Sequence, residues 1–226
     1  VRMGNSHGKL IAQSFVTIRA QIEALGLDWF EIARVFGFDP NIIDDPEAFL
    51  PADLFFAIHE YLAEVTGNDA IGVVLGAQIP IGSSRIFDYV ALTAPTIGQS
   101  LENWCRFEKL VSNIVQASLH DEDGKRYLTW QISDFFGAHT QTAARAVAFA
   151  STRIKHMLGE TQAELICDFT QSEPRQIETY YRILGKNIRF NQPQNRIGIP
   201  LDVMNVVPPA AEANLYSLIE QTALAK

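Results

Sequence analysis

Three charged side chains near the middle of the chain have the types and spacing to orient a small polar group. Arg85 and Asp88 are three residues apart, so on a helix they share one face and can pair. Glu108 falls in the next predicted helix, in the middle of an apolar arc that includes Leu101 and Trp104. A carboxylate within a buried face needs a partner or a ligand, because burying an unpaired charge is costly.

Two interpretations of these charges are open from the sequence. In the first, they form a structural ion pair, Arg85 with Asp88 or with Glu108. In the second, they orient a small ligand inside an otherwise apolar cavity, as a few polar groups do in typical ligand sites. The candidate ligand-binding residues are then Arg85, Asp88, Tyr89, Trp104, Glu108 and His59. His59 lies beside an apolar helical stripe, so a buried structural histidine is the alternative to a ligand contact.

A helix stop followed at once by a helix start positions these residues. Pro95 disfavours the helical conformation at Ala94, which predicts the end of a helix over residues 83–94. Thr96 can cap a second helix over residues 97–112, with Gln99 at the spacing of a capping box. Apolar residues cover more than half of that second helix, which indicates burial.

The remaining pattern predicts an α+β fold, with a helical N-terminal half packed on a mixed, mainly antiparallel sheet that carries helices in the C-terminal half. One domain over residues 1–226 is expected, with a helical part at about 10–112 and an α+β part at about 113–226. In the first part, helices are expected over residues 10–25, from 28 to Gly37, from Pro51 to Gly67 and over 69–75. In the second part, the expected elements are a hairpin (113–121 and 125–133), helices (139–158, 174–184 and 211–223) and strands (163–169, 187–190 and 196–199).

Composition limits the classes of partner. The 226 residues are 47% hydrophobic and 19% charged, with a net charge of −8 and no run of lysine or arginine, so this chain alone is poorly suited to grip a phosphate backbone. Its two cysteines, Cys105 and Cys167, fit a reduced core and a cytoplasmic protein. No apolar run reaches the roughly 18 residues of a membrane span, so no membrane association is expected.

The search for catalytic motifs predicts no enzyme, no catalytic residue, no metal site and no cofactor. The chain has no HExxH, GxSxG, P-loop or GxGxxG after a strand. Gly72 and Gly76 could cradle a phosphate, but close helix packing is the alternative. Residues 121–123 are interpreted as a solvated hairpin turn against a cation site, and Trp130 with Tyr180-Tyr181 as core aromatics against a stacking surface.

An ordered series of turns and caps resembles a known family. The first half carries ALGLD at 24–28, GFDP at 37–40, DP at 45–46, VVLG at 73–76 and LTAPTIGQSL at 92–101. The second half carries EP at 173–174, YYR at 180–182 and RF at 189–190. Together they resemble the N-terminal effector domain of AraC-type bacterial transcription regulators, in the helical "arabinose-binding" subtype rather than the cupin-like one.

This resemblance implies a domain that senses a small-molecule effector and forms a homodimer, with promoter DNA bound by a C-terminal pair of helix-turn-helix motifs absent from this chain. It also implies that Arg85 and Asp88, where the family tends to have small residues, fill or re-specify the usual pocket. The exposed side of the last helix, around Leu215, Leu218 and Ile219, is a candidate dimer or linker surface. The alternative hypothesis is a dimerisation module without an effector.

Overall fold

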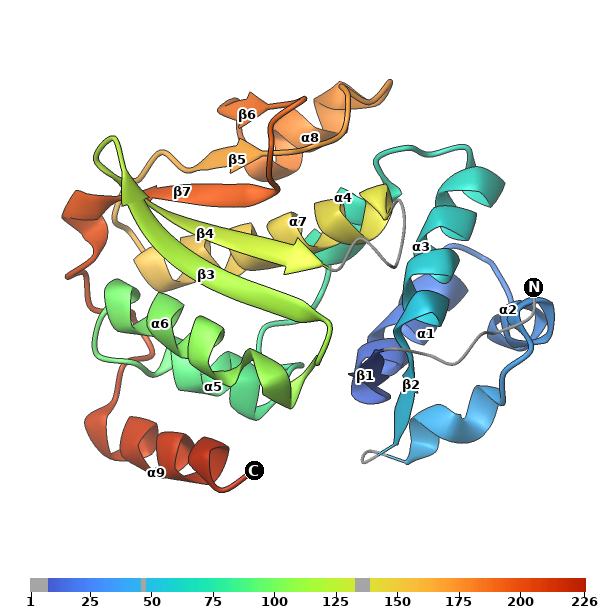
Figure 1. The fold of residues 1–226 in the computed structure, drawn as a ribbon, viewed down its shortest axis with the longest axis horizontal. Helices are drawn as coiled ribbons and strands as arrows, with labels where there is room; N and C mark the ends of the chain where they lie inside the picture. The colour runs from blue at the N-terminus through green and yellow to red at the C-terminus, as the bar shows by residue number, and fades with distance from the viewer. Residues whose placement is uncertain (1–7, 46–47, 133–138) are drawn as a thin grey trace.

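The computed structural model describes residues 8–45, 48–132 and 139–226, and within them the chain has the expected α+β fold. In Figure 1 the first helices lie on the right, and the five-stranded sheet with its helices fills the left side. Pro46 and Ser133, which the sequence placed in a helix stop and at the end of a strand, lie outside the described residues.

The N-terminal part is built from short helices around a core of its own. The core includes Phe15, Ile22, Trp29, Ile58 and Leu62, all fully buried. Its elements are β1 (Lys9–Ile11), α1 (Gln13–Ala24), α2 (Trp29–Phe36), a 3₁₀ turn (Pro40–Asp44), β2 (Phe49–Pro51), α3 (Ala52–Thr66) and α4 (Ile71–Ala77).

A two-stranded sheet in this part was not predicted. The sequence placed a helix from Leu10, but Leu10 lies in β1, opposite Leu50 of β2, and α1 begins only at Gln13. Leu10 also forms an isolated bridge with Ser112, more than a hundred residues along the chain. The apolar periodicity of α1 continues back to Leu10, so local pattern could not separate the strand from the helix.

Helix ends follow the predicted capping residues. The Asp28 side chain accepts a hydrogen bond from the Phe30 N–H at the start of α2, and Gly37 and Gly67 end α2 and α3 in the left-handed conformation (φ 71° and 61°). Thr96 Oγ1 likewise accepts from the Gln99 N–H at 3.2 Å. These caps set the directions in which the helices leave their turns.

The C-terminal part contains the predicted mixed sheet. Its strand order is β3-β4-β7-β5-β6, and every pairing is antiparallel except β5 with β6. Asp123 and Gly124 make the β3–β4 turn with positive φ, as the sequence predicted. The strands are β3 (Val115–Glu122), β4 (Lys125–Ile132), β5 (Ile166–Asp168), β6 (Ile188–Arg189) and β7 (Arg196–Pro200).

Helices cover this sheet and connect it to the N-terminal part. The helices of the remaining chain are α5 (Ile86–Leu92), α6 (Ile97–Phe107), α7 (Thr140–Leu158), α8 (Ile177–Leu184) and α9 (Ala213–Leu224), of which α9 packs on α5. Figure 1 shows α7 running along one face of the sheet, with α6 and α5 below the strands and α9 at the lower edge. α4 packs directly on α7, where a Cβ on Gly72 or Gly76 would come within 2.2 or 2.3 Å of a backbone oxygen of α7. This contact confirms the helix-packing interpretation of the two glycines.

The two helices around Pro95 are shorter than predicted. α5 begins at Ile86 rather than residue 83, because Arg85 adopts φ 52° and ψ −125°, which breaks the helix. α6 ends at Phe107 and passes into a 3₁₀ turn, Glu108–Leu110. Arg85 therefore lies just before α5, and Glu108 lies just after α6, instead of within the two helices.

Candidate ligand-binding cavity

A cavity of about 600 Å³ lies between the N-terminal helices and the C-terminal part. One side is formed by residues of β1, α1, β2 and α3, and the other by the loop before α5, the end of α6, β3, β4 and α7. Its volume is in the ordinary range for small-molecule sites, which is about 300–1,000 Å³. A molecule bound here would contact both parts of the chain.

The walls of the cavity are largely aromatic. The described aromatic residues that line it are Phe49, Phe55, Phe56, Phe87, Trp104, Trp130 and Phe149. Phe55 and Phe56 come from α3 and Phe149 from α7, so the aromatic surface is assembled from distant segments. Such walls favour a ligand with an apolar or planar body. Trp130 belongs to this wall, and Tyr180 packs in the core behind the sheet.

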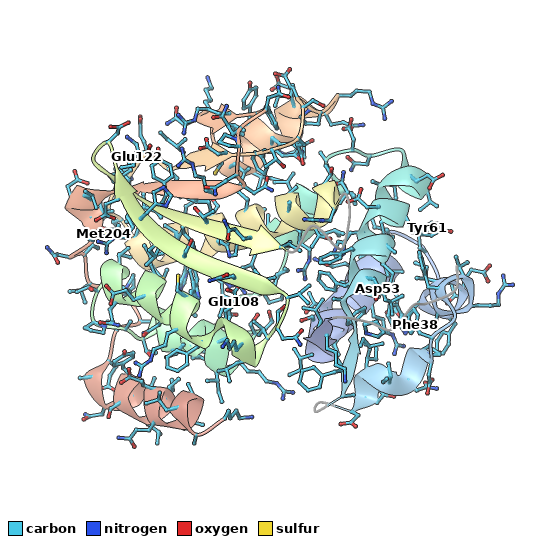
Figure 2. The ribbon with its side chains drawn as sticks, in the orientation of Figure 1. Phe38, Asp53, Tyr61, Glu108, Glu122 and Met204 are labelled. Atoms are coloured by element: carbon cyan, nitrogen blue, oxygen red, sulfur yellow. The ribbon has the colours of Figure 1, made fainter. Side chains whose placement is uncertain are left out.

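Glu108 is the acidic group of this cavity, and Figure 2 shows it beside β3. It is 8% exposed, and its Oε2 accepts a hydrogen bond of 2.5 Å from the Ala117 N–H of β3. Burial raises the pKa of the Glu108 carboxyl from about 4.5 to about 7, and the Ala117 hydrogen bond partly opposes this. Near neutral pH the carboxyl can therefore act as a hydrogen-bond donor or as an anion.

Arg145, on α7, is the basic group that lies against the aromatic wall. Its guanidinium carbon is 5.0 Å from the ring centroid of Phe55, a cation–π distance. Its Nε has no hydrogen-bond partner among the described residues. Burial, followed by the positive charge of Arg153, lowers the pKa of Arg145 to about 9. The side chain retains some accessible area, which we attribute to the cavity it borders.

Two further polar groups of the cavity are buried without partners in the described part of the chain. They are the Trp104 Nε1–H, on α6, and the Thr142 hydroxyl, on α7. Buried hydrogen-bonding groups are normally satisfied, and those that are not call for a specific explanation. A ligand in the cavity would supply one.

The structure brings three of the six candidate residues to the cavity: Arg85, Trp104 and Glu108. Asp88 is fully buried elsewhere, and its partner is Arg153 of α7 rather than the expected Arg85. The Asp88 carboxylate also accepts hydrogen bonds from the Gly82 and Ser84 N–H groups. Of the two interpretations that the sequence left open, the ion pair of Arg85 with Asp88 or Glu108 is therefore not found among the described residues, since Asp88 pairs with Arg153 and Glu108 accepts from the Ala117 N–H.

His59 and Tyr89 also lie outside the cavity lining. His59 is fully buried, with Nδ1 2.7 Å from the carbonyl oxygen of Phe55. Burial and then the charge of Arg145 lower the pKa of His59 to about 3, so its ring is neutral. Tyr89 is 46% exposed, and its ring lies over Gly82. Neither side chain touches the cavity directly.

Sequence reasoning missed Arg145, although a signal was present. From Ala143 to Arg153, α7 is otherwise uncharged and mostly apolar, and its two charges are Arg145 and Arg153. A charge within an apolar helical pattern is the same kind of signal as Glu108, which the sequence placed in the apolar face of the predicted helix over residues 97–112. Only the fold shows that Arg153 has a carboxylate partner and that Arg145 has none among the residues described.

Other candidate features have structural roles. Asp121 and Glu122 of the hairpin pair with Arg126 and Arg196. Within the described residues, no group of three His, Cys, Asp or Glu side chains is placed to hold a metal ion. Cys105 and Cys167 are free thiols whose pKa is raised to about 12, mainly by burial.

No helix in the described ranges has the length and apolar character needed to cross a membrane.

Comparison with known proteins agrees with this architecture. Residues 26–206 match the model of the arabinose-binding domain of AraC transcription regulators, N-terminal. The ornithine utilization regulator of Pseudomonas aeruginosa is 23% identical over 186 residues, which cover 82% of this chain and 53% of that protein. The crystal structure of the transcriptional regulator CdpR, also from Pseudomonas aeruginosa, has a similar fold, with a TM-score of 0.59 at 14% identity, covering 87% of this chain and 60% of that one.

The chain therefore belongs to the family of N-terminal arabinose-binding domains of AraC-type transcription regulators. It spans about half the length of the curated relative it matches.

Proposed function

We propose that this chain is the effector-sensing domain of an AraC-type transcription regulator, forming one ligand-sensing and dimerisation unit over residues 1–226. The cavity between the two parts of the chain is the observation that carries the proposal. A ligand that contacts both sides can favour one arrangement of the parts over another, which is the requirement for an allosteric response. Promoter DNA would be bound by helix-turn-helix motifs in another domain, and no catalysis is proposed.

Helix α6 offers a route from the cavity to α9. Trp104 and Glu108 at the end of α6 line the cavity. Asn103 of the same helix is fully buried and donates hydrogen bonds to the Val90 carbonyl of α5 (2.9 Å) and to the Tyr216 hydroxyl of α9 (3.2 Å). A ligand that shifts α6 would thus shift α9.

We propose that α9 is the dimer or linker surface through which the response is read. Leu215 and Leu218 are 43% and 62% exposed on this helix. Ile219, which the sequence placed on the exposed side, instead packs inward near Val90 and Ala223. Two large exposed leucines on one helical face suit contact with a second copy or with a linker.

The proposal is tested by screening the 226-residue chain against a metabolite library by thermal shift, followed by sedimentation with and without each compound that binds. An effector should raise the unfolding midpoint by several degrees, because stabilisation grows with ligand concentration over Kd. It should also change the monomer–dimer equilibrium. The Asn103→Ala variant should retain ligand binding and lose the effect on the dimer.

The alternative is a dimerisation module without an effector, which the exposed α9 leucines also suit. In that case no compound would shift the midpoint, while Leu218→Glu would still weaken the dimer. Ser217→Glu, at a neighbouring exposed position, is the matched control.

A further inference from the structure

The charge around the cavity is opposite to that of the chain. The whole chain has a net charge of −8, but among the described residues the charged side chains that line the cavity are four cations and one acid. Arg85, Lys109 and Lys226 are exposed and lie at its edge, whereas Arg145 and Glu108 lie deeper. This balance favours an anionic ligand, because charges of one sign in a low-dielectric cleft concentrate ligands of the opposite sign.

Within the described part of the chain, Arg145 has no counter-charge such as Asp88 provides for Arg153, the other arginine in this stretch of α7. Arg153 forms a double hydrogen bond with Asp88 and reaches backbone carbonyl groups. Arg145 forms no ion pair with any described residue, and its Nε lacks an acceptor. A guanidinium carries five N–H donors in a planar fork that matches a carboxylate. An anion from solution could provide the missing partner.

The rest of the cavity indicates the body of that ligand. The ring of Phe55 lies at cation–π distance from Arg145, and Trp130 and Trp104 line the same cavity. The unpartnered groups of Trp104 and Thr142 can each hydrogen-bond a polar atom near the head group. Deep in the cavity, Arg145 is a guanidinium without an ion pair to any described residue, and Glu108 lies in the same cavity, which suits one negative charge better than two.

We propose that the cavity takes an organic monocarboxylate with an apolar or aromatic body, whose carboxylate pairs with the guanidinium of Arg145. The body lies between the aromatic side chains of α3, α6, β4 and α7. This inference rests on the proposed function, because it names the chemical class of the effector. It separates this cavity from one suited to a neutral, polyhydroxylated sugar, which would need many more hydrogen-bonding groups.

The test is calorimetric titration of the 226-residue chain with decanoate and 4-phenylbutyrate, and with the neutral amide of each. The carboxylates should bind and the amides should bind about tenfold or more weakly, because charge-assisted pairs with arginine are the stronger hydrogen bonds. Arg145→Gln should weaken carboxylate binding about 10- to 100-fold and leave amide binding unchanged. Arg182→Gln, which removes an exposed cation on α8, should change neither.

Each remaining outcome has a defined meaning. Equal binding of acids and amides, or full carboxylate affinity in Arg145→Gln, overturns the monocarboxylate inference and leaves effector binding intact. If neither the acids nor the amides bind, the inference is overturned. The proposed function is removed as well only if no compound of the metabolite library shifts the unfolding midpoint. If Arg145→Gln fails to fold by circular dichroism, Arg145→Lys keeps the charge without the fork, and unchanged carboxylate affinity in that variant contradicts the pairing.

The site of binding is tested by filling the cavity. Ala146 lines it from α7, one residue beyond Arg145. Ala146→Trp should abolish binding of acids and amides alike. Full affinity in that variant places the carboxylate elsewhere and overturns the inference.

Discussion

Asp88 of α5 and Arg153 of α7 form a doubly hydrogen-bonded ion pair in which neither side chain has solvent-exposed area. The Nε–Oδ1 distance is 2.6 Å and the Nη2–Oδ2 distance is 2.8 Å. Arg153 also donates to the carbonyl of Pro80, 3.0 Å away. The pair thereby fixes the loop that enters α5, and this loop is part of the cavity wall.

Removing one member of this pair should be strongly destabilising. Asp88→Ala leaves the Arg153 charge buried without its partner, and such changes cost about 3–5 kcal/mol of the free energy of unfolding. Urea unfolding followed by circular dichroism measures the change. Asp121→Ala is the control, because it breaks a solvent-exposed pair with Arg126 and should change the urea midpoint little. Similar losses in both variants would contradict a special role for the buried pair.

Glu108 should make the stability of the chain depend on pH. Its pKa in the folded state is about 7 instead of about 4.5, so between these values the folded chain holds a proton that the unfolded chain releases. The free energy of unfolding therefore falls as the pH rises through this window, by on the order of 3 kcal/mol. Above pH 7 the loss is complete.

Glu108→Gln should remove this dependence, because glutamine stays neutral and can still accept from the Ala117 N–H. Urea midpoints of the two proteins, measured from pH 4.5 to pH 8, should diverge as the pH rises, with the variant more stable at the upper end. Glu102→Gln, on the exposed side of α6, provides the control. Parallel curves for Glu108→Gln and the unchanged chain would show that Glu108 is not buried as described.

Replacing Arg85 with glycine should stabilise the folded chain. Its φ of 52° with ψ of −125° is a backbone conformation that favours glycine, and a non-glycine residue there stores about 1–3 kcal/mol of strain. Glycine relieves this strain but loses more chain entropy on folding, about 0.5–1 kcal/mol, so we expect a net gain of about 1 kcal/mol. Thermal unfolding of Arg85→Gly and Arg85→Ala makes the comparison, because alanine removes the side chain without relieving the backbone. Equal midpoints would show that the strain is absent.

Gly76 should not tolerate a side chain. A Cβ there would lie 2.3 Å from the Arg145 carbonyl oxygen, which belongs to the backbone of α7 and cannot rotate away. Gly76→Ala should therefore force α4 and α7 apart and cost at least about 1–3 kcal/mol, the usual effect of overpacking. It should also weaken ligand binding, because α7 carries Arg145. Gln78→Ala, at the end of the same helix, is the control, and an equal urea midpoint for the two variants would mean that the helices are not in close contact.

Much of the fold could be predicted because it depends on local chemistry. Thr96, Asp28 and the glycines at 37 and 67 mark helix ends through capping and backbone preference, which act within a few residues. The hairpin turn at Asp123-Gly124 is equally local. The β1–β2 pair was missed because its partners, Leu10 and Leu50, are forty residues apart.

The cavity was predicted only in part. Glu108 and Trp104 were found because a carboxylate within an apolar helical face is visible in one helix. Asp88, Tyr89 and His59 were also chosen for local reasons, and none of them lines the cavity. Arg145 was missed because its interest comes from having no ion pair among the described residues, and the partners of a side chain are a property of packing.

The sequence by itself determined the α+β class, most helix boundaries, the hairpin and the family, because each of these depends on periodicity, caps and turns along the chain. The tertiary structure decided which charges meet. Asp88 and Arg153 are sixty-five residues apart and pair in the interior, while Arg145 borders a cavity beside Phe55 with no ion pair to any residue that the structure describes. Electrostatic and hydrogen-bond partners are set by distance in space, and the packing of α7 against α4 helps to fix those distances.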